Sequence, residues 1–456
     1  MARENLDDLL ALGDRVVERA RARGADVAEA VVSEGSHLST RVRMREPELV
    51  EEAGSRAVGL RVLLGKQVAV SYTSDLTEAG LERLVEDAIE LARLSQPDEL
   101  AGPPEPELLS RREQHADLGL YDESISDVGA RVALARAKVA EAAAFAADPR
   151  ITNSEGATFS RVSGGRALVT SGGFRGAVDG TYASLSVSPV ADDEGGKKRS
   201  GGYWTARRHL AGLLADEEVG REAARRTVAK LGARKIETQE CAVVFDPEAG
   251  RSILGLLAGC VNGGAIWRRA SYLVEREGDR VASELVTVVD DPLIPGGPGS
   301  RPFDGEGLLS RRNVVVERGV LKTYLLDTYS ARKLGKRSTA SASRGSNGGV
   351  GPSTTNFVLE PGTMSPEELV RSTERGLYVT EMMGFGFNAV TGDFSRGAAG
   401  FWIEGGEKAF PVSEVTISLN LDELLKRIDA VANDLDLRTS VATPTFRVSA
   451  MTVAGR

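Results

Sequence analysis

Histidine and cysteine are scarce in this chain, which has three histidines and two cysteines among its 456 residues. Two cysteines cannot build a disulfide framework, so a reducing compartment, the cytoplasm, is the expected location. His37, His115 and His209 are far apart, and none of them belongs to a paired zinc-binding motif. Cys241 and Cys260 lie in apolar runs without the Cys-x-x-Cys spacing of a metal clip. We therefore expect no metal and no cofactor in this chain.

Long hydrophobic runs and an excess of positive charge are also missing. No window approaches the ~20 apolar residues of a membrane span, and residues 1–8 lack the apolar core of a secretory signal. The net charge is -9, from 66 acidic and 57 basic residues. Because nucleic acids are polyanions that attract basic surfaces, this balance argues against nucleic acid as a partner. Neither a membrane nor a nucleic acid is expected to bind.

Signatures of nucleophilic catalysis or phosphate binding are lacking as well. No Gly-x-Ser-x-Gly elbow with suitable partners occurs. The Gly-rich run 345–354 lacks the lysine of a phosphate loop, and Pro352 removes an amide donor, so a flexible surface loop is expected there. Carboxylates in or beside Gly-rich turns remain as candidates for acid–base work or a hard cation: Asp290, Asp291, Asp393, Glu404, Glu407 and Glu414.

The first third of the chain mixes helical and extended patterns. Apolar spacing predicts a helix between the capping Asn5 and Gly24, and further helices at 78–94 and 126–147. Extended runs at 28–33, 38–44, 58–64 and 68–72 predict strands, the last two joined by a turn at Gly65-Lys66. Residues 96–122 are rich in proline and glycine and are expected to form a linker. These patterns predict an N-terminal α+β domain over residues 1–150.

From residue 150 onward, short β-type runs alternate with turn residues. Runs at 151–161, 167–171 and 182–190 predict strands of one sheet within a transitional, β-rich segment, 151–240. Residues 241–456 predict a larger, mostly antiparallel and barrel-like β domain with inserted helices. Two of these begin at the caps Asp246-Pro247 and Ser365-Pro366, and a third is expected at 421–435. The fold class is therefore α+β.

The run from Asn388 to Glu407, which reads NAVTGDFSRGAAGFWIEGGE, resembles the signature of the TldD/PmbA family. Residues 59–76, 352–357 and 411–417 are similar to the same family in the same order, so the resemblance spans nearly the whole chain. The family pairs two related subunits. The TldD type carries His-Glu-x-x-x-His on a helix and binds zinc, whereas the PmbA type, also called TldE, lacks this motif.

In this chain the corresponding helix is the one expected to begin at Asp246. Its run 256–263, LLAGCVNG, contains neither histidine nor glutamate. The resemblance therefore implies a non-catalytic subunit of a zinc metallopeptidase complex that processes or degrades peptides and unfolded segments. Zinc is expected only in a TldD-type partner subunit, and this chain is not expected to catalyse hydrolysis alone.

The signature run also supplies candidate contacts to a peptide or a partner subunit: Asp393, Arg396, Gly397, Gly400, Phe401, Trp402 and Glu404. Glycines around the extended run 401–403 let another backbone approach, so a peptide or partner strand could add to its edge. The simpler interpretation is a β-hairpin that turns at Gly405-Gly406. Trp402 suits either the centre of an interface or the chain's own core.

Two other functions are compatible with these patterns. One is a stand-alone homodimeric protein that binds peptides without cleaving them. The other is an enzyme that uses the carboxylates or a metal. In the leading interpretation the chain works as an oligomer, with the zinc-bearing relative or with itself, through its C-terminal domain.

Overall fold

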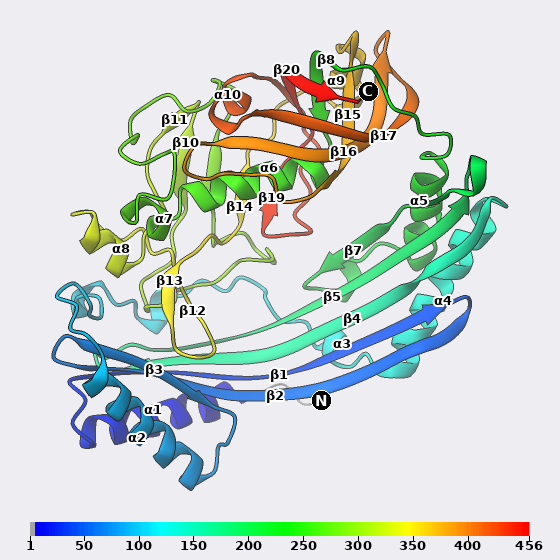
Figure 1. Cartoon of the computed structure of the whole chain (residues 1–456). Coiled ribbons are helices and arrows are strands. Elements are labelled where there is room, and N and C mark those ends of the chain that lie inside the picture. The colour runs from blue at the N-terminus through cyan, green and yellow to red at the C-terminus, as the bar shows by residue number, and fades with distance from the viewer. Residues whose placement is uncertain (1–4, 456) are drawn as a thin grey trace.

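The structure is a computed structural model that describes residues 5–455. A long, curved antiparallel sheet is its largest element (Figure 1). The strands follow the order β3-β2-β1-β4-β5-β6, and β7 also pairs with β5. Their bounds are β1 (Val27–Arg43), β2 (Glu46–Leu64), β3 (Gln67–Thr73), β4 (Ile151–Thr170), β5 (Arg175–Asp192), β6 (Lys198–Ser200) and β7 (Tyr203–Arg207). The sheet crosses the boundary expected at residue 150, because β4 pairs with β1 from Ala157 to Thr170.

Two pairs of helices cover one face of this sheet. Alternate residues of β1, such as Ala30 and Val32, turn toward α1 (Leu6–Ala22) and α2 (Glu78–Leu94) and share one core with them. Farther along β1, Leu38 belongs to a second core with α4 (Ala130–Ala147) and α5 (Asp216–Val228). Asn5 caps α1 as expected, and the hairpin turn between β2 and β3 is confirmed at Gly65. The helix expected at 126–147 begins later, as α4 at Ala130, and the short helix α3 (Glu123–Ser126) precedes it.

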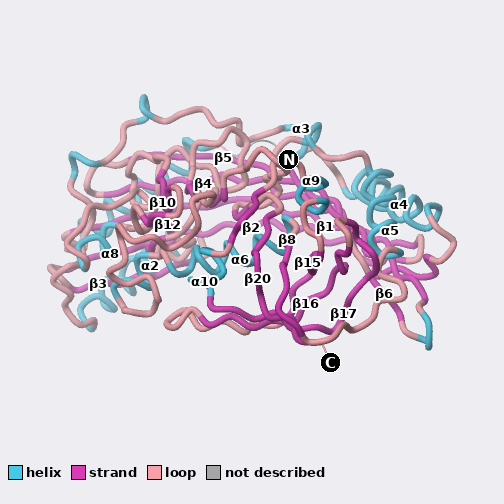
Figure 2. Tube along the Cα trace, turned by 90° about the horizontal axis from the view of Figure 1, so that it is seen from above, coloured by secondary structure: helices cyan, strands magenta, loops and turns pink. Residues whose placement is uncertain are grey.

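The C-terminal half contains a small closed barrel, as expected. Five strands follow the order β17-β16-β15-β8-β20, and pairing of Thr416–Ser418 with Thr452–Ala454 joins β17 to β20. The β15–β8 contact is parallel and the others are antiparallel. The bounds are β8 (Gln239–Phe245), β15 (Arg375–Met383), β16 (Asp393–Glu404), β17 (Glu407–Asn420) and β20 (Phe446–Ala454). Figure 2 shows these strands side by side, seen from above.

Shorter elements surround the barrel. A second sheet comprises β9 (Val288–Asp290), β10 (Asn313–Glu317), β11 (Val320–Leu321), β14 (Phe357–Leu359) and β19 (Val441–Ala442). The helices are α6 (Pro247–Cys260), α7 (Gly263–Trp267), α8 (Thr328–Lys333), α9 (Pro366–Arg371) and α10 (Leu421–Lys426). Caps by Asp246 and Ser365 are confirmed for α6 and α9. No helix within residues 5–455 is long and apolar enough to cross a membrane.

The prediction of a helix over residues 421–435 is wrong, because the observed helix is much shorter. The structure ends α10 at Lys426 and continues as β18 (Ile428–Val431), which pairs with β20. Ile428 and Val431 are buried in that strand. Their spacing fits a helix equally well, and pairing with a distant strand decides the outcome.

The Gly-rich run 345–354 is also not a free surface loop. It belongs to a hairpin of β12 (Ala342–Arg344) and β13 (Val350–Pro352), whose tip lies against β2. A side chain at Gly59 of β2 would collide with the backbone oxygen of Ser346. Arg344, at the base of the tip, forms an ion pair with Glu29 of β1 at 2.7 Å, and both side chains are almost fully buried. Arg61 of β2 contacts the same carboxylate at 2.9 Å.

The expected linker, residues 96–122, contains the short 3-10 helices Pro106–Leu108 and Arg112–Gln114 and packs against the C-terminal half. The Ser110 hydroxyl donates to the carbonyl oxygen of Gly307 at 2.9 Å. The His115 ring lies 4.8 Å from the ring of Phe303. This segment therefore connects the curved sheet to the C-terminal half through side-chain contacts as well as through the backbone.

We predict that Arg344→Ala lowers the free energy of unfolding by about 3–5 kcal/mol, because it leaves Glu29 buried with half of its counter-charge. Arg312→Ala is the control: Arg312 pairs with Glu360 on the surface, where both side chains are 43% exposed, and a loss within ~1 kcal/mol is expected. Urea denaturation of the two variants checks this. Equal losses would show that the buried pair does not hold the hairpin.

Candidate functional site

Helix α6 occupies the position where the family resemblance places a zinc motif. Asp246 starts it by accepting the backbone N–H of Ala249 at 2.7 Å, with Pro247 in the first turn. Near its end, Leu257 and Cys260 point into the core, whereas a Cβ on Gly255 or Gly259 would meet no atom. The exposed side of α6 therefore presents bare backbone near its C-terminal end.

This part of α6 supplies no side chain that suits a zinc ion. Cys260 is buried, and burial raises the pKa of its thiol to about 11, which disfavours the thiolate that binds metals. Within residues 5–455, no three His, Cys, Asp or Glu side chains gather closely enough to hold a metal. Two histidines make local contacts instead: His115 with the Ser110 hydroxyl at 2.9 Å, and His209 with the carbonyl oxygen of Gly119 at 2.7 Å.

The candidate residues of the signature run lie along β16, but they do not form one site. Both edges of β16 are occupied, by β15 and by β17, so a peptide cannot add to this strand as the sequence suggested. Gly400 allows a close approach within the chain itself, since a side chain there would overlap the carbonyl oxygen of Tyr378. The hairpin turn at Gly405-Gly406 has the expected geometry, with both glycines at positive φ.

The other members of the run point in different directions. Trp402 is 4% exposed and belongs to the core shared by the barrel strands and α6. Phe401 turns to the opposite face of β16, toward a pocket. Asp393 and Glu404 are exposed at the two ends of the strand, and the guanidinium of Arg396 lies 5.8 Å from the ring of Phe394. Gly397 lies beside Met383 of β15.

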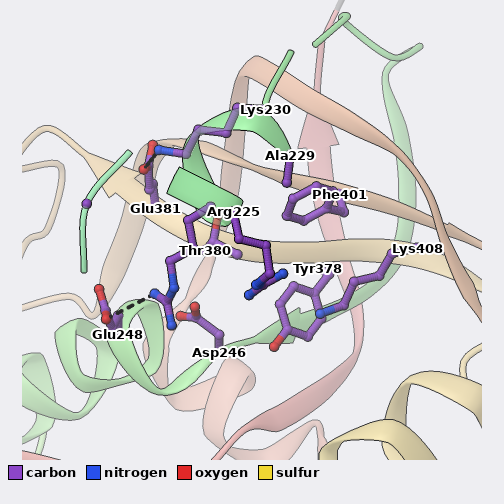
Figure 3. Close-up of a pocket in the computed structure, with 12 residues that line it drawn as sticks. Arg225, Ala229, Lys230, Asp246, Glu248, Tyr378, Thr380, Glu381, Phe401 and Lys408 are labelled. Atoms are coloured by element: carbon purple, nitrogen blue, oxygen red, sulfur yellow. Dashed lines mark hydrogen bonds and ion pairs between the residues drawn. The ribbon is translucent and has the colours of Figure 1, made fainter. Parts of the chain in front are cut away.

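Phe401 leads to a pocket of about 280 Å³ between α5 and the barrel (Figure 3). Helix α5 and the residues after it form one wall, and β15, β16, β17 and the start of α6 form the other. Charged and aromatic side chains alternate around it. The lining residues are Gly202, Arg225, Arg226, Ala229, Lys230, Asp246, Glu248, Tyr378, Thr380, Glu381, Phe401 and Lys408.

Two ionisable groups in this pocket are strongly perturbed. Burial raises the pKa of Asp246 to about 7; the charge of Glu248 adds to this, while the Ala249 N–H and two nearby cations oppose it. Desolvation lowers the pKa of Lys408 to about 8, although Asp246 favours its charged form. The ammonium of Lys408 lies 3.3 Å from the ring centroid of Tyr378, which is a cation–π contact. Such shifts in a cleft are typical of functional sites.

Local sequence patterns do not predict this pocket. The sequence predicts Asp246 as a helix cap and Phe401 as a candidate contact to a peptide or a partner subunit, but it does not bring the two together. Lys408 follows a tight turn and has no motif around it. The one available signal was a capping aspartate that directly follows a fully buried strand end, Val243–Phe245, where a carboxylate is costly unless it has partners.

Comparison with known proteins gives a consistent relationship over most of the chain. Three domain families match: PmbA/TldA metallopeptidase domain 1 at residues 28–92, the central domain at 123–231 and the C-terminal domain at 238–455. The chain is 35% identical to the metalloprotease PmbA of Escherichia coli O157:H7 over 432 residues, which is 95% of this chain and 93% of that protein. It is also 35% identical to the PmbA homologue of Haemophilus influenzae over 440 residues, covering 96% and 94% of the two chains.

Solved structures agree. A protein of Bacteroides thetaiotaomicron, named as a candidate modulator of DNA gyrase, superimposes with a TM-score of 0.92 at 26% identity, covering 99% of each chain. TldE of Thermococcus kodakarensis has the same fold, with a TM-score of 0.86 at 22% identity over 97% of this chain and all of that one.

We predict that Trp402→Ala lowers the free energy of unfolding by about 3–5 kcal/mol, because it removes a large side chain from the core. Phe385→Ala is the control, since Phe385 is 96% exposed, and a change within ~0.5 kcal/mol is expected. Thermal and urea denaturation check both variants. An unchanged stability of the Trp402 variant, with assembly lost, would instead assign Trp402 to a subunit interface.

A second prediction concerns the pH dependence of stability. The pKa of Asp246 rises from 3.8 to about 7 in the folded chain, so its burial opposes folding increasingly as pH rises from about 4 to 7, by at most about 4 kcal/mol. Asp246→Asn keeps a capping oxygen but removes this cost. The melting temperature of the variant, relative to wild type, should therefore be higher at pH 8 than at pH 5.

Asp122→Asn gives the matched control for this pH experiment. Asp122 caps α3; burial would raise its pKa, but hydrogen bonds from the Leu210 N–H and from Ser124 lower it. Its contribution to stability is therefore present above its usual pKa and lost in acid, so its replacement should cost more at pH 8 than at low pH. A pH-independent effect of Asp246→Asn would contradict the assignment of a buried, perturbed carboxyl group.

Proposed function

This chain belongs to the PmbA/TldD family of metallopeptidases, and on that premise we propose that it is the non-catalytic subunit of a TldD/TldE-type zinc metallopeptidase complex. The observation that carries the proposal is the composition of α6. From Leu256 to Gly263, which is the end of α6 and the start of α7, the chain offers only apolar side chains, glycines, a buried thiol and the Asn262 amide. Zinc in peptidases is held by imidazole, thiolate and carboxylate groups, and this set of residues does not fit the metal.

The fold supports a role in holding extended chains. In Figure 1, α6 lies on the side of the C-terminal half that faces the curved sheet. Its exposed glycines, Gly255 and Gly259, leave its backbone accessible. On the sheet, the β1 residues between those that face the helices are Ser33, Gly35, His37 and Ser39 near the middle, none of them a large apolar residue. A surface of this kind suits an unfolded segment without selecting its side chains.

In this proposal the division of labour is between subunits. The zinc-bearing relative supplies the metal and the hydrolytic step, and this chain supplies the surface that binds the peptide and completes the assembly. In this proposal the chain supplies no metal ligand, and its residues contribute by binding and positioning the peptide. The same surface without a zinc-bearing partner would give a homodimeric peptide-binding protein, which is the competing outcome of the test below.

The experiment is to purify this chain alone, its zinc-bearing relative alone, and the two after co-expression. We predict no stoichiometric zinc and no peptidase activity for this chain alone, and a mixed complex with chelator-sensitive activity after co-expression. Elemental analysis, size-exclusion chromatography and cleavage of an unstructured peptide provide the readouts. About one tightly held zinc per chain, with activity in the chain alone, would overturn the proposal. A homodimer that binds the peptide and ignores the relative would establish the alternative.

A further inference from the structure

Most charges that line the pocket between α5 and the barrel are already neutralised inside the protein. Arg225 and Arg226 both contact Glu222, with N–O distances of 2.7 and 2.8 Å. Arg226 also reaches Glu248 at 3.2 Å, and Lys230 forms an ion pair with Glu381. These pairs need no ligand.

Lys408 is different. Within the described part of the chain it forms no ion pair and no hydrogen bond, and its ammonium contacts only the faces of Tyr378, at 3.3 Å, and Phe401, at 6.0 Å. An ammonium group has three donors, and an aromatic ring satisfies only one side of it. Lys408 is exposed, so its remaining donors are hydrated and face both the solvent and the pocket that it lines.

Asp246 is the acidic counterpart. Its side chain is buried, and Oδ1 accepts the N–H of Ala249 at 2.7 Å, but no described residue donates to Oδ2. Lys408 and Asp246 line the same pocket without forming an ion pair with each other. Oδ2 is not among the buried polar atoms that lack a partner, so solvent reaches it, and a ligand that donates a hydrogen bond can replace water there.

We propose that this pocket binds a small zwitterion, namely a free amino acid or a short peptide with both ends free. The ligand carboxylate binds the ammonium of Lys408, and the ligand ammonium binds the carboxyl group of Asp246. Tyr378 and Phe401 provide aromatic surface for an apolar side chain (Figure 3). The volume, about 280 Å³, lies just below the usual range for ligand sites, about 300–1,000 Å³, which suits a small ligand.

Such molecules are the products of peptide hydrolysis, and in that respect the inference rests on the proposed function. All four proposed contacts, Lys408, Asp246, Tyr378 and Phe401, lie on the barrel side of the pocket. The binding itself requires only this chain. The pocket can therefore be tested without the zinc-bearing relative, and a failed binding experiment leaves the zinc and assembly results unaffected.

The probe is the dipeptide Ala-Phe, titrated into the purified wild-type chain at pH 7 by calorimetry. We expect saturable binding that weakens roughly tenfold or more for N-acetyl-Ala-Phe, which lacks the ammonium, and for Ala-Phe amide, which lacks the carboxylate. These comparisons use one folded protein throughout. Absence of binding at millimolar Ala-Phe overturns the proposal, and so does equal binding of either blocked dipeptide.

Variants of the chain assign the two ends of the ligand. Lys408→Met keeps the length of the side chain and should weaken binding of Ala-Phe roughly tenfold or more, but should leave the affinity for Ala-Phe amide unchanged. Asp246→Asn should weaken binding of Ala-Phe and leave the affinity for the N-acetyl form unchanged. Lys235→Met is the control, because Lys235 pairs with Glu414 at 3.3 Å and does not line the pocket. Equal losses in all three variants would overturn the assignment.

Discussion

The structure depends on a buried ion cluster that joins the curved sheet to the C-terminal half. Arg344, from the β12–β13 hairpin, and Arg61, from β2, share the carboxylate of Glu29 on β1. Burial would raise the pKa of Glu29, but the two guanidinium groups outweigh it and lower that pKa to about 2. The cluster is therefore charged at every pH where the protein is expected to work. Because a buried charge without its partner costs free energy, separating the hairpin from the sheet is unfavourable.

This constraint explains the position of elements far from the cluster. Once the hairpin is fixed on β2, the C-terminal half is held over the sheet, and α6 faces it (Figure 1). The second junction, between α5 and the barrel, lies toward the other end of the sheet. The first junction contains the Glu29 ion cluster beside a pocket of about 310 Å³ that Arg61 and Val350 line, and the second encloses the pocket that Lys408 and Asp246 line. A structure held at both ends can present an extended surface between them without burying that surface in its own core.

Local patterns in the sequence predict many of the helix and strand positions of this fold. Asn5, Asp246 and Ser365 each carry a capping side chain at a change of hydrophobic period, and the helices begin where they indicate. Ile428 and Val431 show the limit, because their spacing fits both a helix and the strand they form. The Gly-rich hairpin shows another: its conformation is fixed by Glu29, more than 300 residues away along the chain. Nothing within residues 345–354 encodes that contact.

The candidate site illustrates the same limit in chemical terms. The signature run predicts contacts at both Phe401 and Trp402; the structure buries Trp402, whereas Phe401 lines the pocket. Asp246 and Lys408 are separated by about 160 residues and converge only because β8, β15, β16 and β17 are adjacent in the barrel. The charged groups at the two junctions differ in how completely they are paired, and this difference distinguishes a structural ion cluster from a candidate binding site. Glu29 has both of its guanidinium partners, as a structural ion cluster requires, whereas Lys408 and Asp246 retain unused hydrogen-bonding capacity toward a shared space. A protein that needed these two groups only for stability would gain more by pairing or replacing them.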